Sequence, residues 1–368
     1  MMKNFCLALL FLTLTACNFN SKATMENIPV DFYIGTYTDA NSQGIYSSRL
    51  QPDGTFDVIK PAAEINNPSF LARSNNGRFL LAVSETTVGA LHSFEIQGDT
   101  LNTINSKETG GAHPCFVTIN KAGDVLVANY TGGSIGYLRL DEKGKLSDLL
   151  DLKQHIGSGS IPRQDAPHAH SAWFDTISGK IIAVDLGTNE LWFYELNHSS
   201  GQLLPAKQAK LEMTEGAGPR HLDFHPNGKW IYVLNELDCT VSVLDREADS
   251  TYSEKQSITT LPLEFHEQNT CADIHVSPDG RFVYASNRGH NSIAIFAVND
   301  SDGTLQSSGN VLTRGETPRN FSLSPNGKFL LVANQDSDNI VSFLRDEQDG
   351  SLRYVSEIKV PKPVCILF

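Results

Sequence analysis

The chain has 368 residues, with 29 Lys and Arg against 42 Asp and Glu, and its formal net charge is −13 at pH 7. Hydrophobic residues make up 40% and charged residues 19%, so the composition excludes a generally disordered chain and allows a large buried core. The acidic balance excludes nucleic acid as a partner, because a phosphate backbone requires a basic surface. A small anionic ligand remains open, since one cleft can carry a local charge opposite to the net charge.

The first residues have the pattern of an export signal. A weakly basic start is followed by the apolar run Phe5–Leu14, which is too short to span a membrane and fits the core of a signal peptide. The run ends in Leu14-Thr15-Ala16-Cys17, which resembles the lipobox of bacterial lipoproteins, a family in which the Cys after the cleavage point carries a lipid. The alternative is an ordinary secretory peptide in which Cys17 is present by chance.

We therefore expect residues 1–16 to be a signal peptide, residues 17–29 to be the lipidated Cys17 with a polar tether, and residues 30–368 to form a single domain. The mature protein would be exported and anchored to a bacterial membrane, on its periplasmic or cell-surface side, through the lipid alone.

From residue 30 onward, one pattern recurs seven times: an apolar run rich in β-forming residues that ends in a polar pair. The instances are Phe32–Tyr37, Leu80–Glu85, Leu126–Tyr130, Ile181–Leu186, Ile231–Glu236, Val283–Arg288 and Leu330–Gln335. They are 45 to 56 residues apart, and the longest interval separates the third from the fourth. This is the size of a four-stranded propeller blade, roughly 40–50 residues, and no stretch shows sustained helical periodicity.

Turns and strand openings support the same repeat. Six of the runs follow a tight turn that ends in glycine, and a strand precedes each turn. These strands open with Pro and a polar residue in most repeats: Pro68-Ser69, Pro114-Cys115, Pro167-His168, Pro219-Arg220 and Pro318-Arg319, with Thr270-Cys271 in the remaining one. The opening that the first repeat lacks appears only at the C-terminus, as Pro363-Val364-Cys365. The sequence therefore predicts an all-β, seven-bladed β-propeller whose C-terminal strand completes the N-terminal blade and closes the ring.

Hairpin midpoints predict which residues share one end of the ring. Residues equidistant from the turn of an antiparallel hairpin lie opposite each other, and the midpoint between Arg220 and Glu236 is the turn residue Gly228. Two further repeats give the same result, and the innermost strands of a propeller line its central channel. We therefore expect one mouth of the channel to carry Tyr37, Glu85, His113, Tyr130, His168, His170, Arg220, His221, Glu236, Arg288, Arg319 and Gln335.

Three arginines from successive repeats, Arg220, Arg288 and Arg319, are a notable concentration in so acidic a chain. Guanidinium groups bind carboxylate or phosphate in a forked geometry, so a mouth that gathers them suits an anionic substrate. Glu236 or a histidine beside them offers a general base for water, and an arginine can stabilise a developing oxyanion. The alternative for any one of these residues is structural, since an Arg–Glu pair can also brace neighbouring blades.

Other chemistries are less well supported. His168 and His170 lie at alternate positions and could hold a metal, but no third ligand has clear spacing, so we expect neither a metal nor a cofactor. We expect no serine in a nucleophile elbow. His221 fits a place behind the site, and His275 fits packing within a strand. With Cys6 in the signal and Cys17 lipidated, we expect the remaining cysteines to be buried free thiols in strands, although an oxidising compartment permits disulfides: Cys115, Cys239, Cys271 and Cys365.

The combination of segments resembles one known family over roughly residues 30–368. The segments are Tyr33-Ile34-Gly35-Thr36-Tyr37-Thr38, Pro167-His168-Ala169-His170, Gly218-Pro219-Arg220-His221, Asn235-Glu236, Asn287-Arg288-Gly289 and Pro318-Arg319-Asn320. They are similar to the seven-bladed lactonase family, which holds bacterial propeller-type 6-phosphogluconolactonase and fungal carboxy-muconate lactonizing enzyme. The resemblance implies a metal-free site whose catalytic residues fall on His170, Arg220, Glu236 and Arg288. From the residues placed at the channel mouth, we expect a further group to bind substrate: Tyr37, Glu85, Tyr130, His168 and Arg319.

The implied activity is hydrolysis of a sugar lactone to the aldonic acid by activated water, with 6-phosphogluconolactone as the leading substrate. The general base would be His170 or Glu236, and we expect a monomer that acts on a small anionic lactone. Because an exported enzyme would not meet a cytosolic substrate, an extracytoplasmic lactone or a carboxy-muconate-type lactonizing activity remains an alternative. A non-catalytic propeller lipoprotein that binds an envelope ligand or a protein is a further one.

Overall fold

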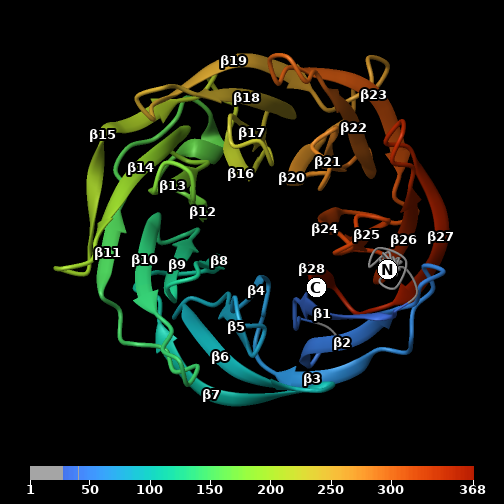
Figure 1. The fold of residues 1–368 in the computed structure, drawn as a ribbon, viewed down its shortest axis with the longest axis horizontal. Helices are drawn as coiled ribbons and strands as arrows, with labels where there is room; N and C mark the ends of the chain where they lie inside the picture. Colours follow the sequence, from blue (N-terminus) through green and yellow to red (C-terminus); the bar gives the residue numbers. More distant parts are fainter. Residues whose placement is uncertain (1–27, 40) are drawn as a thin grey trace, which may run out of the picture.

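The computed structural model describes residues 28–39 and 41–368, which form strands β1 to β28 and one 3-10 helix, η1 (Pro162–Gln164). The strands make seven four-stranded antiparallel sheets set around a central axis, so the fold is the predicted all-β, seven-bladed propeller (Figure 1). The predicted signal peptide, residues 1–16, and Cys17 lie outside the described residues.

Each sheet places one strand next to the axis and three strands successively further out (Figure 1). In that order, the sheets are β28 (Pro363–Leu367), β1 (Val30–Thr36), β2 (Gly44–Leu50) and β3 (Lys60–Glu64); β4 (Leu71–Arg73), β5 (Phe79–Ser84), β6 (Ala90–Gln97) and β7 (Thr100–Glu108); β8 (Pro114–Ile119), β9 (Asp124–Asn129), β10 (Ser134–Arg139) and β11 (Asp151–Gln154); β12 (Ala169–Phe174), β13 (Lys180–Asp185), β14 (Glu190–Asn197) and β15 (Gln202–Glu212); β16 (Pro219–Phe224), β17 (Trp230–Asn235), β18 (Thr240–Arg246) and β19 (Tyr252–Thr259); β20 (Thr270–Val276), β21 (Phe282–Arg288), β22 (Ser292–Val298) and β23 (Leu305–Leu312); and β24 (Pro318–Leu323), β25 (Phe329–Asn334), β26 (Asn339–Arg345) and β27 (Leu352–Lys359).

The ring closes as predicted, because the C-terminal strand β28 joins the sheet that begins with β1. The two strands are antiparallel, with Tyr33 opposite Leu367 and Ile34 opposite Ile366. Pairing β28 with β1 gives the first blade its inner strand, so the sheet edges at the two ends of the chain cover each other.

Seven hydrophobic clusters lie between neighbouring sheets, one at each interface between blades. The second strand of a blade packs on both faces, which is why its residues form a near-continuous apolar run rather than an alternating one. In β17, for example, every residue from Trp230 to Asn235 is buried. This packing makes each blade depend on its two neighbours and fixes the inner strands relative to one another.

The predicted hairpin register is wrong by one residue near the axis, although the predicted end of the ring is right. Pro219 pairs with Asn235 and His221 with Leu234, so Arg220 is the extra residue of a β-bulge rather than the partner of Glu236. His170, Cys115 and Arg319 are extra residues of the same kind in other blades. A bulge breaks the alternation of side chains and changes the direction of one of them. This accounts for polar residues in otherwise apolar strands, at the end of the ring that forms the predicted channel mouth.

The two residues of the repeated polar pair have different roles. The first is buried and bonds to backbone of the surrounding loops: Asn129 Nδ2 donates to Thr109 O at 3.2 Å, and Asn287 Nδ2 to Thr260 O at 3.1 Å. The second residue follows at the axial end of the blade, as Glu236 follows Asn235. The first residue of the pair therefore has a structural role, and the position after it can hold a functional side chain.

Candidate active site

A cavity of about 290 Å³ opens at the end of the ring where the second strands finish. It is lined by Tyr37, Glu85, Cys115, Tyr130, Arg163, His170, Glu236, Thr270, Arg288 and Arg319. Seven of these residues were predicted from the sequence, and they come from different blades. The volume is near the lower end of the range for small-molecule sites, roughly 300–1,000 Å³.

Glu236 is the negative centre of the cavity and contacts three arginines. Its Oε2 lies 2.9 Å from Arg220 Nε and 3.0 Å from Arg288 Nη2, and its Oε1 accepts a hydrogen bond from Arg163 Nη2 at 3.2 Å. Burial alone would raise the pKa of Glu236, but the charges of these arginines outweigh it and lower the pKa to about 2. Glu236 is therefore ionised at neutral pH, with both oxygens engaged.

Arg220 lies behind Glu236 rather than on the cavity wall, and its side chain is only 2% exposed. Its Nη1 donates to the carbonyl of Ala272. Burial, and then the charges of Arg319 and Arg288, lower the pKa of Arg220 to about 10, which still leaves it protonated at neutral pH. Arg288 reaches the cavity directly, and its Nη2 also donates to Cys271 O at 2.7 Å.

Tyr37, Glu85 and Arg319 form the opposite wall. Tyr37 Oη donates to Glu85 Oε2 at 3.0 Å, and the guanidinium of Arg319 lies 5.4 Å from the centre of the Tyr37 ring. Burial raises the pKa of Tyr37, so the phenol stays protonated and acts as a donor. This wall adds one more arginine and one carboxylate to the cavity.

His170 is a buried histidine that faces the cavity among aromatic rings. Its ring meets those of Tyr130 and His221 edge-on, with centroids 5.5 Å and 5.3 Å away, and its Nδ1 lies 3.7 Å from Cys115 Sγ. Burial, and then the charge of Arg220, hold the pKa of His170 well below its usual value, so the imidazole is neutral at neutral pH. Burial likewise raises the pKa of Cys115, which keeps it a thiol.

The other predicted rim residues lie outside the cavity lining. His168 stacks on Tyr130 with ring centroids 4.7 Å apart, His113 Nδ1 lies 2.9 Å from Thr131 Oγ1, and Gln335 is bonded to Asp336. His221 lies behind the site, as expected, with Nδ1 2.8 Å from Asp273 Oδ1.

Sequence reasoning missed three lining residues: Arg163, Cys115 and Thr270. Arg163 stands on η1 in the connection between the third and fourth repeats, where the sequence interval is longest, and that length was the available signal. Gln164 holds this connection in place, since its Nε2 donates to Leu186 O at 2.9 Å and contacts Asn189 Oδ1 at 3.0 Å. Cys115 and Thr270 gave no chemical signal.

Two sequence expectations need correction. Gly132-Gly133-Ser134-Ile135-Gly136 does have the spacing of a nucleophile elbow, but Ser134 begins β10, is buried and accepts a hydrogen bond from Asn129 Nδ2 at 3.1 Å. Cys239 lies in the turn between β17 and β18 with φ of 58°, not in a strand. The four cysteines from Cys115 onward are buried and free.

Two absences hold for residues 28–39 and 41–368. No group of three or more His, Cys, Asp or Glu side chains there is arranged to hold a metal ion. No helix in this part of the chain is long and apolar enough to span a membrane.

Comparisons with known proteins agree on one family. The family model described as lactonase, 7-bladed beta-propeller, matches residues 31–368. The 6-phosphogluconolactonase of Bacillus subtilis is 35% identical over 295 residues, which cover 78% of this chain and 83% of the relative. The 6-phosphogluconolactonase of Formosa agariphila is 38% identical over 311 residues, which cover 79% and 85%. The solved structure of a periplasmic gluconolactonase of Pseudomonas aeruginosa matches with a TM-score of 0.88 at 30% identity, covering 92% of this chain and 98% of that one.

Proposed function

We propose that this chain, which belongs to the seven-bladed β-propeller lactonase family and is a lactone-hydrolysing carboxylic ester hydrolase, acts on sugar lactones that carry an anionic group. The observation that carries the proposal is the charge of the cavity. Arg163, Arg288 and Arg319 line it and Arg220 lies behind it, against only two carboxylates, Glu236 and Glu85. An excess of fixed positive charge in a partly desolvated site favours an anionic substrate.

The leading substrate is 6-phosphogluconolactone, because two relatives are named for its hydrolysis. Its phosphate would lie towards Arg163, which is the most exposed of the four arginines at 55% of its side chain. Arg288 and Arg319 are deeper and would be left for the lactone carbonyl and the ring hydroxyls. A forked guanidinium suits both tasks, since it presents parallel N–H donors to phosphate or to a developing oxyanion.

His170 is the better candidate for the general base. A base must be unprotonated and must have a free lone pair within reach of water, and the neutral His170 faces the cavity. Glu236 is a weaker choice, because three arginines hold its oxygens and lower its pKa to about 2. In the proposed reaction, Glu236 instead fixes the arginines in position.

The reaction then needs no covalent intermediate. His170 takes a proton from water, the hydroxide oxygen bonds to the lactone carbonyl carbon, and the carbonyl electrons move onto an oxyanion beside Arg288. The ring C–O bond then breaks, and protonated His170 returns the proton to the leaving alkoxide. The products are the regenerated neutral imidazole and an open-chain hydroxy acid, whose carboxyl group releases its proton to solvent at neutral pH.

A monomer attached to the membrane through the predicted lipid anchor would leave the cavity accessible to substrate. β1 runs towards the cavity, with Tyr37 just after it, so Val30 at its start lies at the opposite end of the blade, paired with Leu50. A tether that leads into Val30 therefore favours an orientation in which the cavity faces away from the membrane.

A lactone panel tests the proposed function. The purified protein would be assayed in a pH-stat for acid release above the spontaneous rate, on a phosphorylated, an unphosphorylated and a carboxy-muconic lactone. We expect the highest kcat/KM on the phosphorylated lactone. Equal rates on the charged and uncharged sugar lactones would contradict the assigned substrate class, and no acceleration on any lactone would support a binding propeller instead.

A further inference from the structure

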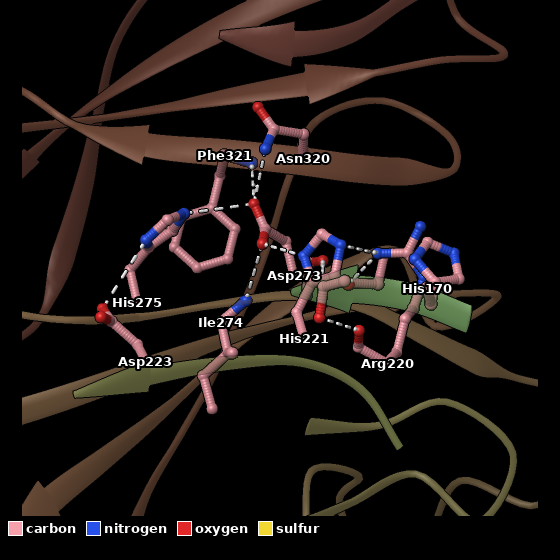
Figure 2. A network of polar contacts seen from close by, with 12 residues as sticks. His170, Arg220, His221, Asp223, Asp273, Ile274, His275, Asn320 and Phe321 are labelled. Carbon is pink, nitrogen blue, oxygen red and sulfur yellow. Dashed lines mark hydrogen bonds and ion pairs between the residues drawn. The ribbon is translucent and has the colours of Figure 1, made fainter. Parts of the chain in front are cut away.

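A buried polar network behind the cavity is not used by the mechanism above. It centres on Asp273 of β20, whose side chain is 4% exposed (Figure 2). Five groups donate to its two carboxylate oxygens: His221 Nδ1 at 2.8 Å, Ile274 N at 3.1 Å, His275 Nε2 at 3.2 Å, Asn320 Nδ2 at 2.6 Å and Phe321 N at 3.3 Å. These donors offset the cost of burying the carboxylate of Asp273, because buried charges are costly unless they are paired.

The network joins the inner strands of four consecutive blades. His221 comes from β16, Asp273 from β20 and Asn320 from β24 (Figure 2). Asn320 Oδ1 in turn accepts from Ile366 N on β28 at 2.7 Å. Asp273 therefore links the inner strands of neighbouring blades, and a substitution of Asp273 would alter contacts along the central channel.

The ionisation of Asp273 fixes the tautomer of His221. Burial would raise the pKa of Asp273, but His275 and His221 lower it below its usual range, so the group only accepts hydrogen bonds. His221 Nδ1 must then be the donor. Burial and the charge of Arg220 lower the pKa of His221 to about 4, against the opposing effect of Asp273. The ring is therefore neutral at neutral pH, and its Nε2 carries a lone pair.

That lone pair faces the buried Arg220. His221 Nε2 lies 3.4 Å from Arg220 Nη1 (Figure 2). Arg220 Nε in turn lies 2.9 Å from Glu236 Oε2. The other charged groups around Arg220 are Arg288 and Arg319. A continuous chain thus runs from Asp273 through His221 and Arg220 to the carboxylate in the cavity.

We propose that Asp273 is a positioning residue, which acts through His221 to hold the guanidinium of Arg220 against Glu236. The inference rests on the proposed function, because Arg220 and Glu236 belong to that site. Its physical content is a choice of tautomer. With Asn at position 273, the new amide can donate a hydrogen bond to His221 Nδ1. The ring proton of His221 then lies on Nε2 instead of Nδ1. Two N–H groups would then face each other between His221 and Arg220, and the arginine would turn away.

Asp273→Asn in the full chain tests the proposal by activity and by tautomer. We expect kcat/KM on the phosphorylated lactone to fall by about ten- to a hundred-fold, the scale of loss found when a hydrogen-bond partner that orients a metal ligand is removed. The ¹⁵N NMR shifts of His221 would change from the Nδ1–H to the Nε2–H form. The matched control is Asp175→Asn, because Asp175 is also buried and paired, at the other end of the blades, with Arg246 Nη2 at 2.5 Å. It should cost stability and leave kcat/KM unchanged.

Two variants of His221 keep the test decisive if Asp273→Asn does not fold. His221→Gln can still donate to Asp273 and accept from Arg220, so it should retain most of the activity. His221→Leu keeps the volume without the bonds and should lose activity about ten- to a hundred-fold. Equal activity in the Gln and Leu variants, or an Asp273→Asn protein that keeps wild-type kcat/KM and tautomer, would overturn the proposal. A wild-type protein without lactonase activity would instead contradict the proposed function, and the tautomer of His221 would still decide the network.

Discussion

Arg288 Nη2 lies 3.0 Å from Glu236 Oε2, so a salt bridge joins two neighbouring blades inside the cavity. The same oxygen meets the buried Arg220 at 2.9 Å. One carboxylate therefore balances several guanidinium groups that would otherwise repel each other in a partly desolvated site. The arrangement links the stability of the ring to the charge of the cavity.

Glu236→Gln should reduce both stability and activity. It leaves Arg220 buried without its carboxylate, and breaking a buried ion pair of this kind costs about 3–5 kcal/mol. Denaturant unfolding measures the loss, with Glu85→Gln as a control, because Glu85 lines the same cavity and bonds to Tyr37 rather than to the buried arginine. If the two variants unfold at the same denaturant concentration, Glu236 does not have the balancing role.

His170→Asn should lower kcat by about 10²–10⁴-fold, the usual contribution of a general base, with little change in KM. The pKa of His170 is held well below 6.5, so its basic form is present at neutral pH and is lost only when the pH falls well below that value. The wild-type rate should thus be flat near neutral pH and decline in acid. The variant should lack that acid decline, whereas Glu236→Gln should keep it. The pH dependence of kcat for the three proteins checks the assignment, and an unchanged decline in His170→Asn would exclude His170 as the base.

Arg163→Gln should act on substrate affinity rather than on stability. Its guanidinium is the most exposed of the four, and a hydrogen bond to a charged group contributes about 1.5–3 kcal/mol, so KM for a phosphorylated lactone should rise by about tenfold or more. KM for an uncharged lactone should change little. Arg353→Gln, on the outer strand β27, removes an exposed arginine far from the cavity and serves as the control. A similar rise of KM for both lactones would contradict the placement of the phosphate.

Stability should fall in mild alkali because of His275. Burial would lower the pKa of His275, but Asp273 and Asp223 raise it to about 9, above the value of about 6.5 for an unfolded chain. The stabilisation is therefore complete below pH 6.5 and is lost as the pH rises through about 9. Thermal unfolding between pH 6.5 and 10 should show a falling Tm in the wild type and a flatter profile in His275→Gln. Parallel profiles would show that the ion pairs of His275 do not contribute.

The blade number, the closing strand and most of the cavity could be predicted from the sequence. The repeat has the period of a four-stranded blade, and each period places one polar pair at the same end of the ring. The register could not be predicted, since a β-bulge adds one residue without any signature beyond the strand opening at Arg220 or Arg319. Hairpin midpoints assume unbroken pairing, and they therefore placed Arg220 opposite Glu236 instead of behind it.

The sequence also did not predict residues whose roles depend on partners that are distant along the chain. Arg163 lies outside the repeat, on a connection whose path depends on the buried Gln164. Asp273 follows two residues that carry no charge, and His275 was expected to be a packing residue. The partners of Asp273 come from blades about 50 residues away, as His221 and Asn320, so no local pattern could reveal the network.

The kcat/KM of the wild type, Arg288→Ala and Arg220→Ala on the phosphorylated lactone is the decisive test of this cavity as the active site. Each arginine balances Glu236, and Arg288 also faces the developing oxyanion, so each variant should lose about 10²–10³-fold of the wild-type value. Circular dichroism would establish that both variants keep the propeller. Full activity in both folded variants would contradict the assignment of this cavity as the site of lactone hydrolysis.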